Sequence, residues 1–165
     1  MSRAFLSPSR CEPGTLTSPL RRALAAVDPA AVRDLWLDGV VEIRGDLSLV
    51  APHPGEELAR LSPRRGFLFT GDDPADAAER LRDAGVLAYD VTGALAGMAI
   101  ESERVMRRLT DLDLEKLPAA GPFAHVTALV LRDGGSGGYR VYVQQELGHY
   151  VAEAVVDALA GLENV

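Results

Sequence analysis

The chain has 165 residues and a formal net charge of −7, with 17 Lys and Arg against 24 Asp and Glu. Hydrophobic residues make up 47% and charged residues 25%, which is the composition of a globular protein with a packed core. Nucleic-acid binding draws its affinity from clustered Lys and Arg. The acidic balance, with basic residues gathered only in isolated Arg pairs, therefore argues against a nucleic-acid partner.

Membrane insertion and secretion are also disfavoured. No apolar run approaches about 20 residues, the length of helix that crosses a bilayer. No charged segment followed by an apolar leader is present. The single cysteine, Cys11, cannot form an internal disulfide. We therefore expect a cytoplasmic protein with no membrane partner.

Composition changes near the start of the chain. Residues 1–19 are rich in Ser, Pro and Arg, so this segment is predicted to be poorly ordered. Residues 20–165 are predicted to form a single α+β domain made of two half-units, about 20–91 and 92–165. A short helix is expected over Leu20–Val27, at the start of the first half-unit.

The first half-unit is predicted to contain four strands and one longer helix. The strands are Val40–Ile43, Leu47–Val50, Phe67–Thr70 and Val86–Val91. The first two should pair as a hairpin, because Gly45-Asp46 between them supplies a turn. The helix precedes the fourth strand, since Asp73 can accept backbone N–H bonds as its N-cap and Gly85 can end it.

The second half-unit begins with a strand over Leu95–Ile100 and a helix that Ser102 caps and that runs through Leu109. Pro118–Pro122 is expected to be a loop. Two further strands should pair across the glycine-rich segment Gly134–Gly138. These two strands are Val126–Leu131 and Tyr139–Val143.

The clearest element is the last one. Its apolar residues recur with the period of one helix face, and they are Leu147, Tyr150, Val151, Ala154, Val155, Ala158, Leu159 and Leu162. This pattern predicts a helix of about four turns that packs across a sheet. Strands and helices do not alternate regularly along the chain. We therefore expect an α+β fold of mixed or antiparallel sheets with helices packed on one side.

Several catalytic motifs are excluded. Gly134–Gly138 matches the Gly-x-Ser-x-Gly pattern of a nucleophile elbow, but an elbow needs a helix after it and a strand follows here. The three histidines, His53, His125 and His149, have no metal-binding spacing. No glycine motif for phosphate binding occurs. We therefore expect no catalytic residue, no metal site and no dinucleotide bound by this chain alone.

Acidic residues form two groups. Asp73 and Asp76 are explained as a helix cap and a favourable charge in the first helical turn. Asp111 and Asp113 follow the helix that ends at Leu109. If Asp113 points into a cleft, its carboxylate could hold an amine or a pterin ring. Otherwise it closes a turn by accepting bonds from nearby backbone N–H groups.

The last third of the chain resembles the folate-binding domain of the glycine-cleavage T-protein, an aminomethyltransferase. The matching residues are a strand ending in Asp90-Val91, the Leu-Thr-x-x-Asp-Leu segment of residues 109–114, and a strand pair around Gly134-Gly135. In that family the aspartate aligned with Asp113 sits at the folate and substrate site. The resemblance therefore implies a truncated folate-binding fold, with a possible tetrahydrofolate site at Asp113.

The chain is still more similar to the gamma subunit family of heterotetrameric sarcosine oxidase, a truncated relative of that domain. The matching residues are Ser18-Pro19-Leu20, Asp113-Leu114 and the strand sequence Gly-Tyr-Arg-Val-Tyr-Val of residues 138–143. This resemblance implies a non-catalytic accessory subunit of a heteromeric oxidase of sarcosine or another secondary amino acid. Its partners would be larger flavoprotein subunits that hold FAD or FMN, and this chain would bind no cofactor alone. The alternative is a stand-alone folate-binding protein of one-carbon transfer, similar to aminomethyltransferase.

Overall fold

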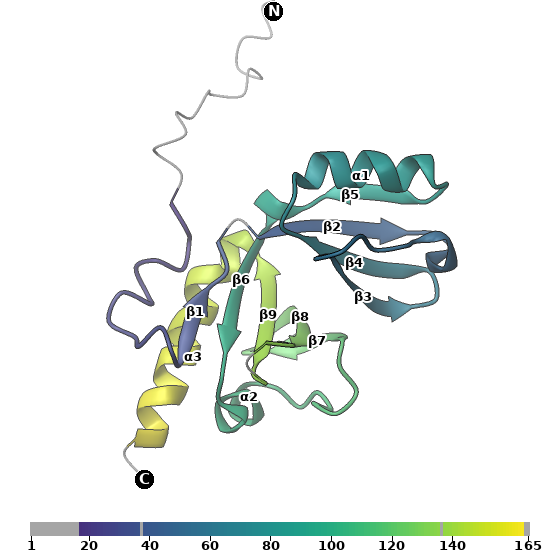
Figure 1. Cartoon of the computed structure of the whole chain (residues 1–165). Coiled ribbons are helices and arrows are strands. Elements are labelled where there is room, and N and C mark those ends of the chain that lie inside the picture. The colour runs from purple at the N-terminus through teal and green to yellow at the C-terminus, as the bar shows by residue number, and fades with distance from the viewer. Residues whose placement is uncertain (1–16, 37, 136, 164–165) are drawn as a thin grey trace, which may run out of the picture.

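The computed structural model describes residues 17–36, 38–135 and 137–163. The segment predicted to be poorly ordered is 1–19, and its residues 1–16, which include Cys11, lie outside the described residues. The described part folds into two antiparallel sheets and three α-helices, as Figure 1 shows. The predicted α+β class is therefore confirmed.

The first sheet has four strands in the order β3-β4-β2-β5, and the second has five in the order β1-β6-β9-β8-β7. The strands are β1 Val32–Asp34, β2 Gly39–Arg44, β3 Glu57–Ser62, β4 Arg65–Thr70, β5 Leu87–Asp90, β6 Leu95–Ile100, β7 Ala119–Phe123, β8 Val126–Arg132 and β9 Tyr139–Gln144. The helices are α1 Pro74–Asp83, α2 Glu103–Leu109 and α3 Gly148–Glu163. The division of residues 20–165 into a single domain of two half-units, about 20–91 and 92–165, stays a prediction.

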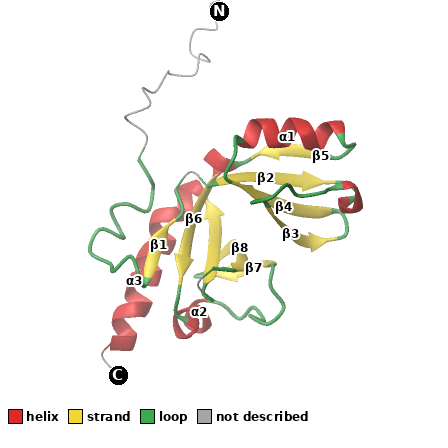
Figure 2. Cartoon of the chain, in the orientation of Figure 1, coloured by secondary structure: helices red, strands yellow, loops and turns green. Residues whose placement is uncertain are grey.

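The elements stack as four layers, with one sheet against the other in the middle and helices outside (Figure 2). Alternation along each strand produces this order, because successive side chains point to opposite faces of a sheet. On β2, Val41 packs in the cluster beneath α1, whereas Val40 faces the second sheet. On β9, Val141 packs beneath α2 and α3, whereas Tyr142 faces the first sheet. Each sheet thus carries helices on one side only.

Local sequence signals set the helix starts as predicted. The Asp73 carboxylate accepts a hydrogen bond from the Ala75 N–H at 2.8 Å, and the Ser102 hydroxyl accepts one from the Val105 N–H at 3.4 Å. The apolar face of α3 is buried along Val151 and Val155 as expected. Tyr150 is an exception, because 47% of this residue is exposed.

The predicted strand over Leu47–Val50 is wrong. The segment forms the short 3-10 helix η2, Leu47–Leu49, because the Asp46 carboxylate accepts a hydrogen bond from the Ser48 N–H at 2.9 Å and caps it. Leu47 is fully buried beneath the first sheet. Strand β2 therefore does not pair with this segment, and pairs with β4 and β5 instead.

The predicted loop over Pro118–Pro122 is also wrong, since residues 119–123 form β7 and pair with β8. Strand β7 is the edge of its sheet, a position where proline is tolerated because the outward N–H groups need no partner. The sequence also gave no signal for β1 and β3. Both are edge strands with few buried residues.

The predicted helix over Leu20–Val27 is replaced by successive turns. The Leu24 N–H donates to the Leu20 carbonyl at 3.0 Å, but no continuous helix follows. The segment is held by packing instead. Leu20 is fully buried in the cluster that includes α3, and Ala23, Leu24 and Val27 pack against the same cluster.

Candidate functional site

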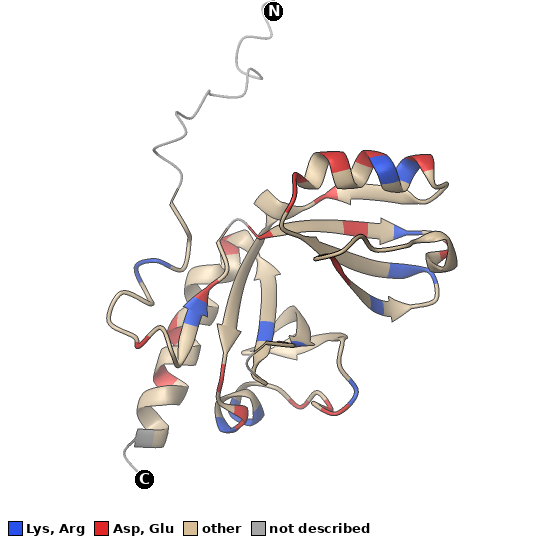
Figure 3. Cartoon of the chain, viewed as in Figure 1, with Lys and Arg blue, Asp and Glu red and all other residues tan. Residues whose placement is uncertain are grey.

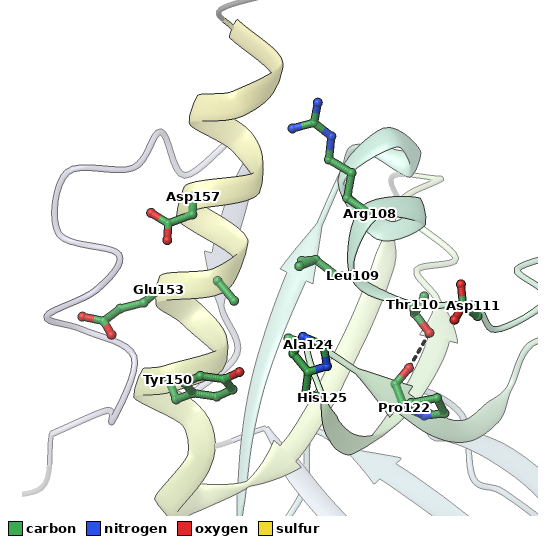
Figure 4. A pocket seen from close by; sticks show the side chains of 11 residues that line it. Arg108, Leu109, Thr110, Asp111, Pro122, Ala124, His125, Tyr150, Glu153 and Asp157 are labelled. Atoms are coloured by element: carbon green, nitrogen blue, oxygen red, sulfur yellow. Dashed lines mark hydrogen bonds between the residues drawn. The ribbon is translucent and has the colours of Figure 1, made fainter.

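A cavity of about 560 Å³ lies between α3, the C-terminal end of α2 and the turn that joins β7 to β8. Figure 4 shows this cavity, which we call the α2–α3 cleft. Its lining combines apolar surface with charged and aromatic groups. The residues used below are Arg108, Leu109, Ala124, His125, Tyr150 and Ala154.

Hydrogen bonds tie the end of α2 to the turn between β7 and β8. The Thr110 hydroxyl donates to the Pro122 carbonyl at 2.5 Å and accepts from the Leu112 N–H at 3.1 Å. The Ala124 N–H donates to the Leu109 carbonyl at 2.7 Å. One wall of the cleft is therefore a single hydrogen-bonded unit.

The turn itself has an unusual backbone. Ala124 and His125 have φ angles of 46° and 66°, in the left-handed region. Two-residue hairpin loops of this kind favour Asn and Gly, because other L-residues are strained there. Ala124 is nonetheless buried in the core, whereas His125 is exposed and lines the cleft.

Arg108 closes the top of the cleft. Its Nη1 donates to the Ala158 carbonyl on α3 at 3.3 Å, and in Figure 4 its side chain extends from α2 over the gap. Gly161 leaves room for this group, since a Cβ at that position would lie 2.6 Å from Arg108 Nη1. The guanidinium therefore joins α2 to α3.

Three acidic residues, Asp111, Glu153 and Asp157, also line the cleft. In Figure 4, Glu153 and Asp157 project from α3 away from α2, and both also line a second hollow on that side of the helix. Glu153 Oε1 lies 3.2 Å from His149 Nε2. Asp111 lies beyond Thr110 from α3. The cleft therefore combines Arg108 and His125 with three carboxylates and apolar groups.

Asp113, the candidate folate residue, lies on the surface in a turn after α2. Its carboxylate accepts a hydrogen bond from the Glu115 N–H at 3.1 Å, and it lies 2.8 Å from Lys116 Nζ. The Lys116 ammonium and this N–H hold the pKa of Asp113 below its ordinary value. The turn that the sequence allowed as an alternative is confirmed, and a folate role for Asp113 stays a prediction.

A second group of charges lies between the two sheets. Arg140 on β9 donates to the Glu57 carboxylate on β3, and its Nε lies 3.9 Å from Asp133 Oδ1. The Arg140 side chain is only 12% exposed. Burial works against its charge, but Tyr142, Glu57 and Asp133 together raise the pKa of Arg140. The group links the two sheets.

Another cavity, of about 580 Å³, lies between the two sheets beside Phe67, Leu129 and Tyr142. Its walls are mainly apolar. Glu42 is the acidic residue in its lining, and Arg44 and Arg65 both contact Oε1 of that carboxylate, at 3.1 and 3.0 Å. This ion-pair group gives the cavity no evident catalytic arrangement.

Sequence reasoning missed the α2–α3 cleft. Arg107-Arg108 is one of the isolated Arg pairs of the sequence, but only Arg108 contacts α3, whereas Arg107 pairs with Glu103 on the same helix. His125 directly precedes the predicted strand Val126–Leu131, and no Gly or Asn signals the turn in which it lies. Neither residue carries a sequence pattern that would have brought it to α3.

Figure 3 shows basic and acidic residues interspersed along both sheets and along α1 and α2, whereas α3 carries acidic residues and no Lys or Arg. Among the described residues, no three His, Cys, Asp or Glu side chains gather as metal ligands do. A search of those residues also found no helix with the length and apolar character needed to cross a membrane.

No family model matches the sequence, and no curated protein matches it. Among solved structures, the fold is similar to a chain of heterotetrameric sarcosine oxidase from Corynebacterium sp. U-96, determined in complex with pyrrole 2-carboxylate. The TM-score is 0.72 at 16% sequence identity, and the match covers 88% of this chain and 95% of that chain. The two chains therefore share an α+β fold over most of their lengths.

Proposed function

We propose that this chain is a non-catalytic accessory subunit, of the gamma type, in a heteromeric flavin-dependent oxidase of sarcosine or another secondary amino acid. The fold match to a chain of heterotetrameric sarcosine oxidase carries the proposal. Because the match covers 88% of this chain and 95% of the other, the two chains are similar in length. The likeness is thus to a small whole chain and not to one part of a large subunit.

Residues of the gamma-type sequence motifs pack closely in this fold, which supports the proposal. Leu20 of the Ser-Pro-Leu motif is fully buried, and a Cβ on Gly148 at the start of α3 would lie 3.1 Å from it. Gly138 directly precedes β9, and a Cβ on Gly138 would lie 2.8 Å from the Ile100 carbonyl oxygen. These residues build a scaffold, as an accessory subunit requires.

In this proposal the flavin belongs to larger partner subunits, and this chain holds none alone. The alternative, a stand-alone folate-binding protein, requires saturable tetrahydrofolate binding by the isolated chain. Asp113 would contribute to that binding only if its surface turn closed over the ligand. The two proposals therefore differ in what the purified chain binds.

The test is purification of the tagged full-length chain from its native host under gentle conditions, followed by intact-complex mass, a visible absorbance scan and a sarcosine oxidation assay. We expect larger partner chains in fixed stoichiometry, a flavin spectrum and sarcosine-dependent oxidation. A colourless monomer or dimer would contradict the accessory role. Tetrahydrofolate titration of that species, with Asp113→Asn as the comparison, then tests the alternative.

A further inference from the structure

The inner face of the first sheet, opposite α1, extends beyond the second sheet. In Figure 1, the end of β2 and the beginnings of β4 and β5 project away from the second sheet. Residues paired directly across neighbouring strands lie on the same face of a sheet. The strand pairing forms two such rows, which are Leu87-Arg44-Arg65 and Tyr89-Glu42-Phe67. Phe67 packs between the sheets, so both rows lie on the inner face, and we call this surface the β5 face.

The β5 face is uncovered and partly apolar. Leu87 is 58% exposed and Tyr89 is 50% exposed, although both are large hydrophobic residues. The cavity of about 580 Å³ between the sheets continues the same face, because Glu42, Arg65 and Phe67 line it. An exposed apolar surface next to an apolar hollow is typical of an interaction site.

Two guanidinium groups on the β5 face share one carboxylate. Arg44 Nη2 lies 3.1 Å from Glu42 Oε1, and Arg65 Nε lies 3.0 Å from the same oxygen. Both arginine side chains are at least half exposed, whereas the Glu42 side chain is largely buried. Asp46, two residues after β2, caps η2 through its bond to Ser48. The three groups of the face therefore leave one positive charge and several N–H donors toward solvent.

The backbone edge of β5 is already partly occupied. β5 is the edge strand of its sheet, and an unpaired edge can accept a strand from another chain. Here Arg82 Nε donates to the Ala88 carbonyl at 3.1 Å, in the middle of that strand. An added strand would have to displace this bond. A partner is therefore expected on the exposed side chains of the β5 face and not along the backbone edge.

A second copy of this chain fits the β5 face poorly. A symmetric dimer through this face would bring two positively charged surfaces together, because the same patch meets itself in such an interface. Like charges brought together across an interface cost affinity. A head-to-tail contact between copies does not close into a dimer. A different chain that carries carboxylates is subject to neither restriction.

We propose that the β5 face docks a different protein chain with an acidic surface. Carboxylates of that chain bind Arg44 and Arg65. Its apolar side chains cover Leu87 and Tyr89 and enter the cavity beside Phe67. Tyrosine and arginine are enriched among the residues that contribute most to protein–protein binding. The inference rests on the proposed accessory role, since the docked chain is a larger subunit of the complex, and it specifies the face that this subunit covers.

The first measurement needs no variant. Hydrogen exchange of backbone amides, followed by mass spectrometry, is compared between the complex purified from the native host and the isolated full-length chain. Peptides that span β5 should exchange more slowly in the complex, because a docked chain removes this strand from solvent. Unchanged exchange over β5 would overturn the proposal.

The second measurement is the dissociation of the complex on dilution, followed by mass photometry. Arg44→Glu and Leu87→Ala should each raise the dissociation constant about tenfold or more. Leu49→Ala is the matched control for leucine, since Leu49 is 52% exposed and lies near Gly85, on the α1 side of the sheet. Arg104→Glu is the control for charge, because Arg104 is exposed on α2. Both controls should leave the dissociation constant unchanged, and circular dichroism checks that every variant folds.

The possible failures are distinguishable. If Arg44→Glu and Leu87→Ala leave the dissociation constant at the value of the controls, the β5 face is not the docking surface, and the accessory role stands because the complex exists. A natural chain recovered without any larger chain would contradict the accessory role, and this proposal with it. A homodimer that Leu87→Ala dissociates would show that a second copy occupies the face, which overturns the proposed partner.

Discussion

The guanidinium carbon of Arg140 on β9 lies 5.1 Å from the centre of the Phe69 ring on β4. A cation of one sheet thus rests on an aromatic ring of the other. The ring of Tyr142, two residues along β9, packs against the same Phe69 ring at a tilt of 37°, with the centres 4.9 Å apart. One strand therefore places a charged and an aromatic side chain around a single residue of the facing sheet.

Replacing this cation should destabilise the fold. Arg140→Met keeps much of the aliphatic stem but leaves Asp133, which is 16% exposed, without one of its partners. We expect a loss of about 2 kcal/mol in the free energy of unfolding, because removing a largely buried cation takes away part of the compensation for the carboxylates that it faces. Urea denaturation measures this. The control is Arg107→Met, which breaks an exposed pair with Glu103 on the same helix and should cost much less. Equal losses in the two variants would show that the buried location of Arg140 does not matter.

The position of the Tyr142 ring depends on Gly97. A Cβ at residue 97 would lie 2.5 Å from Tyr142 Cε1, and the ring is backed by Phe69. Gly97→Ala should therefore lower the free energy of unfolding by about 1–3 kcal/mol through overpacking. Gly71→Ala is the comparison, since no atom lies within 4 Å of a Cβ there. If thermal unfolding midpoints of the two variants agree, the ring moves aside freely.

Sequence patterns predicted the regular core well, because local rules and tertiary packing agree there. The period of α3 and the alternation of β9 each describe a face that is buried in the fold. Asp73 and Ser102 cap their helices as expected. In these places a few neighbouring residues decide the structure.

The candidate site was not predictable in the same way. Arg108 and Ala158 are 50 residues apart, and no local pattern indicates that they meet. Pro122 favoured the prediction of a loop, although the position of β7 at the edge of its sheet allows a proline there. A family resemblance made Asp113 the candidate folate residue, whereas its contacts in the structure are those of a surface turn. Long-range contacts, which sequence spacing does not encode, decide the first two cases, whereas local contacts with Glu115 and Lys116 hold Asp113.

The Tyr139 hydroxyl should make stability depend on pH. It donates a hydrogen bond to Glu103 Oε2 at 3.0 Å. The pKa of Glu103 lies below its ordinary value of 4.5, mainly because of the hydrogen bond from Arg107 and next because of the one from Tyr139. A lowered carboxyl pKa adds stability above the unfolded-state pKa, and that stability is lost as the pH falls through the folded-state pKa. Tyr139→Phe should therefore be less stable than the natural chain at pH 7, with a difference that narrows below pH 4.5.

Urea midpoints between pH 3 and pH 7 measure this narrowing. Arg132 also donates to the Tyr139 hydroxyl, at 3.0 Å, which adds an offset that does not change with pH in this range. Tyr89→Phe is the control, because Tyr89 is half exposed and its hydroxyl forms no hydrogen bond seen among the described residues. A constant difference for Tyr139→Phe at every pH would remove Glu103 from the explanation.

The turn between β7 and β8 offers a test of backbone strain at two adjacent residues. His125 has a φ of 66° and is exposed, so His125→Gly should relieve the strain of the left-handed conformation and stabilise the fold by about 0.5 kcal/mol, net of the entropy cost of glycine. Ala124 has a φ of 46° but is buried. Ala124→Gly relieves similar strain and loses a packed methyl group, which costs about 0.8 kcal/mol or more, so no gain is expected. Urea denaturation of both variants decides the matter. If His125→Gly and Ala124→Gly lower the free energy of unfolding by the same amount, the left-handed backbone of residue 125 stores no strain.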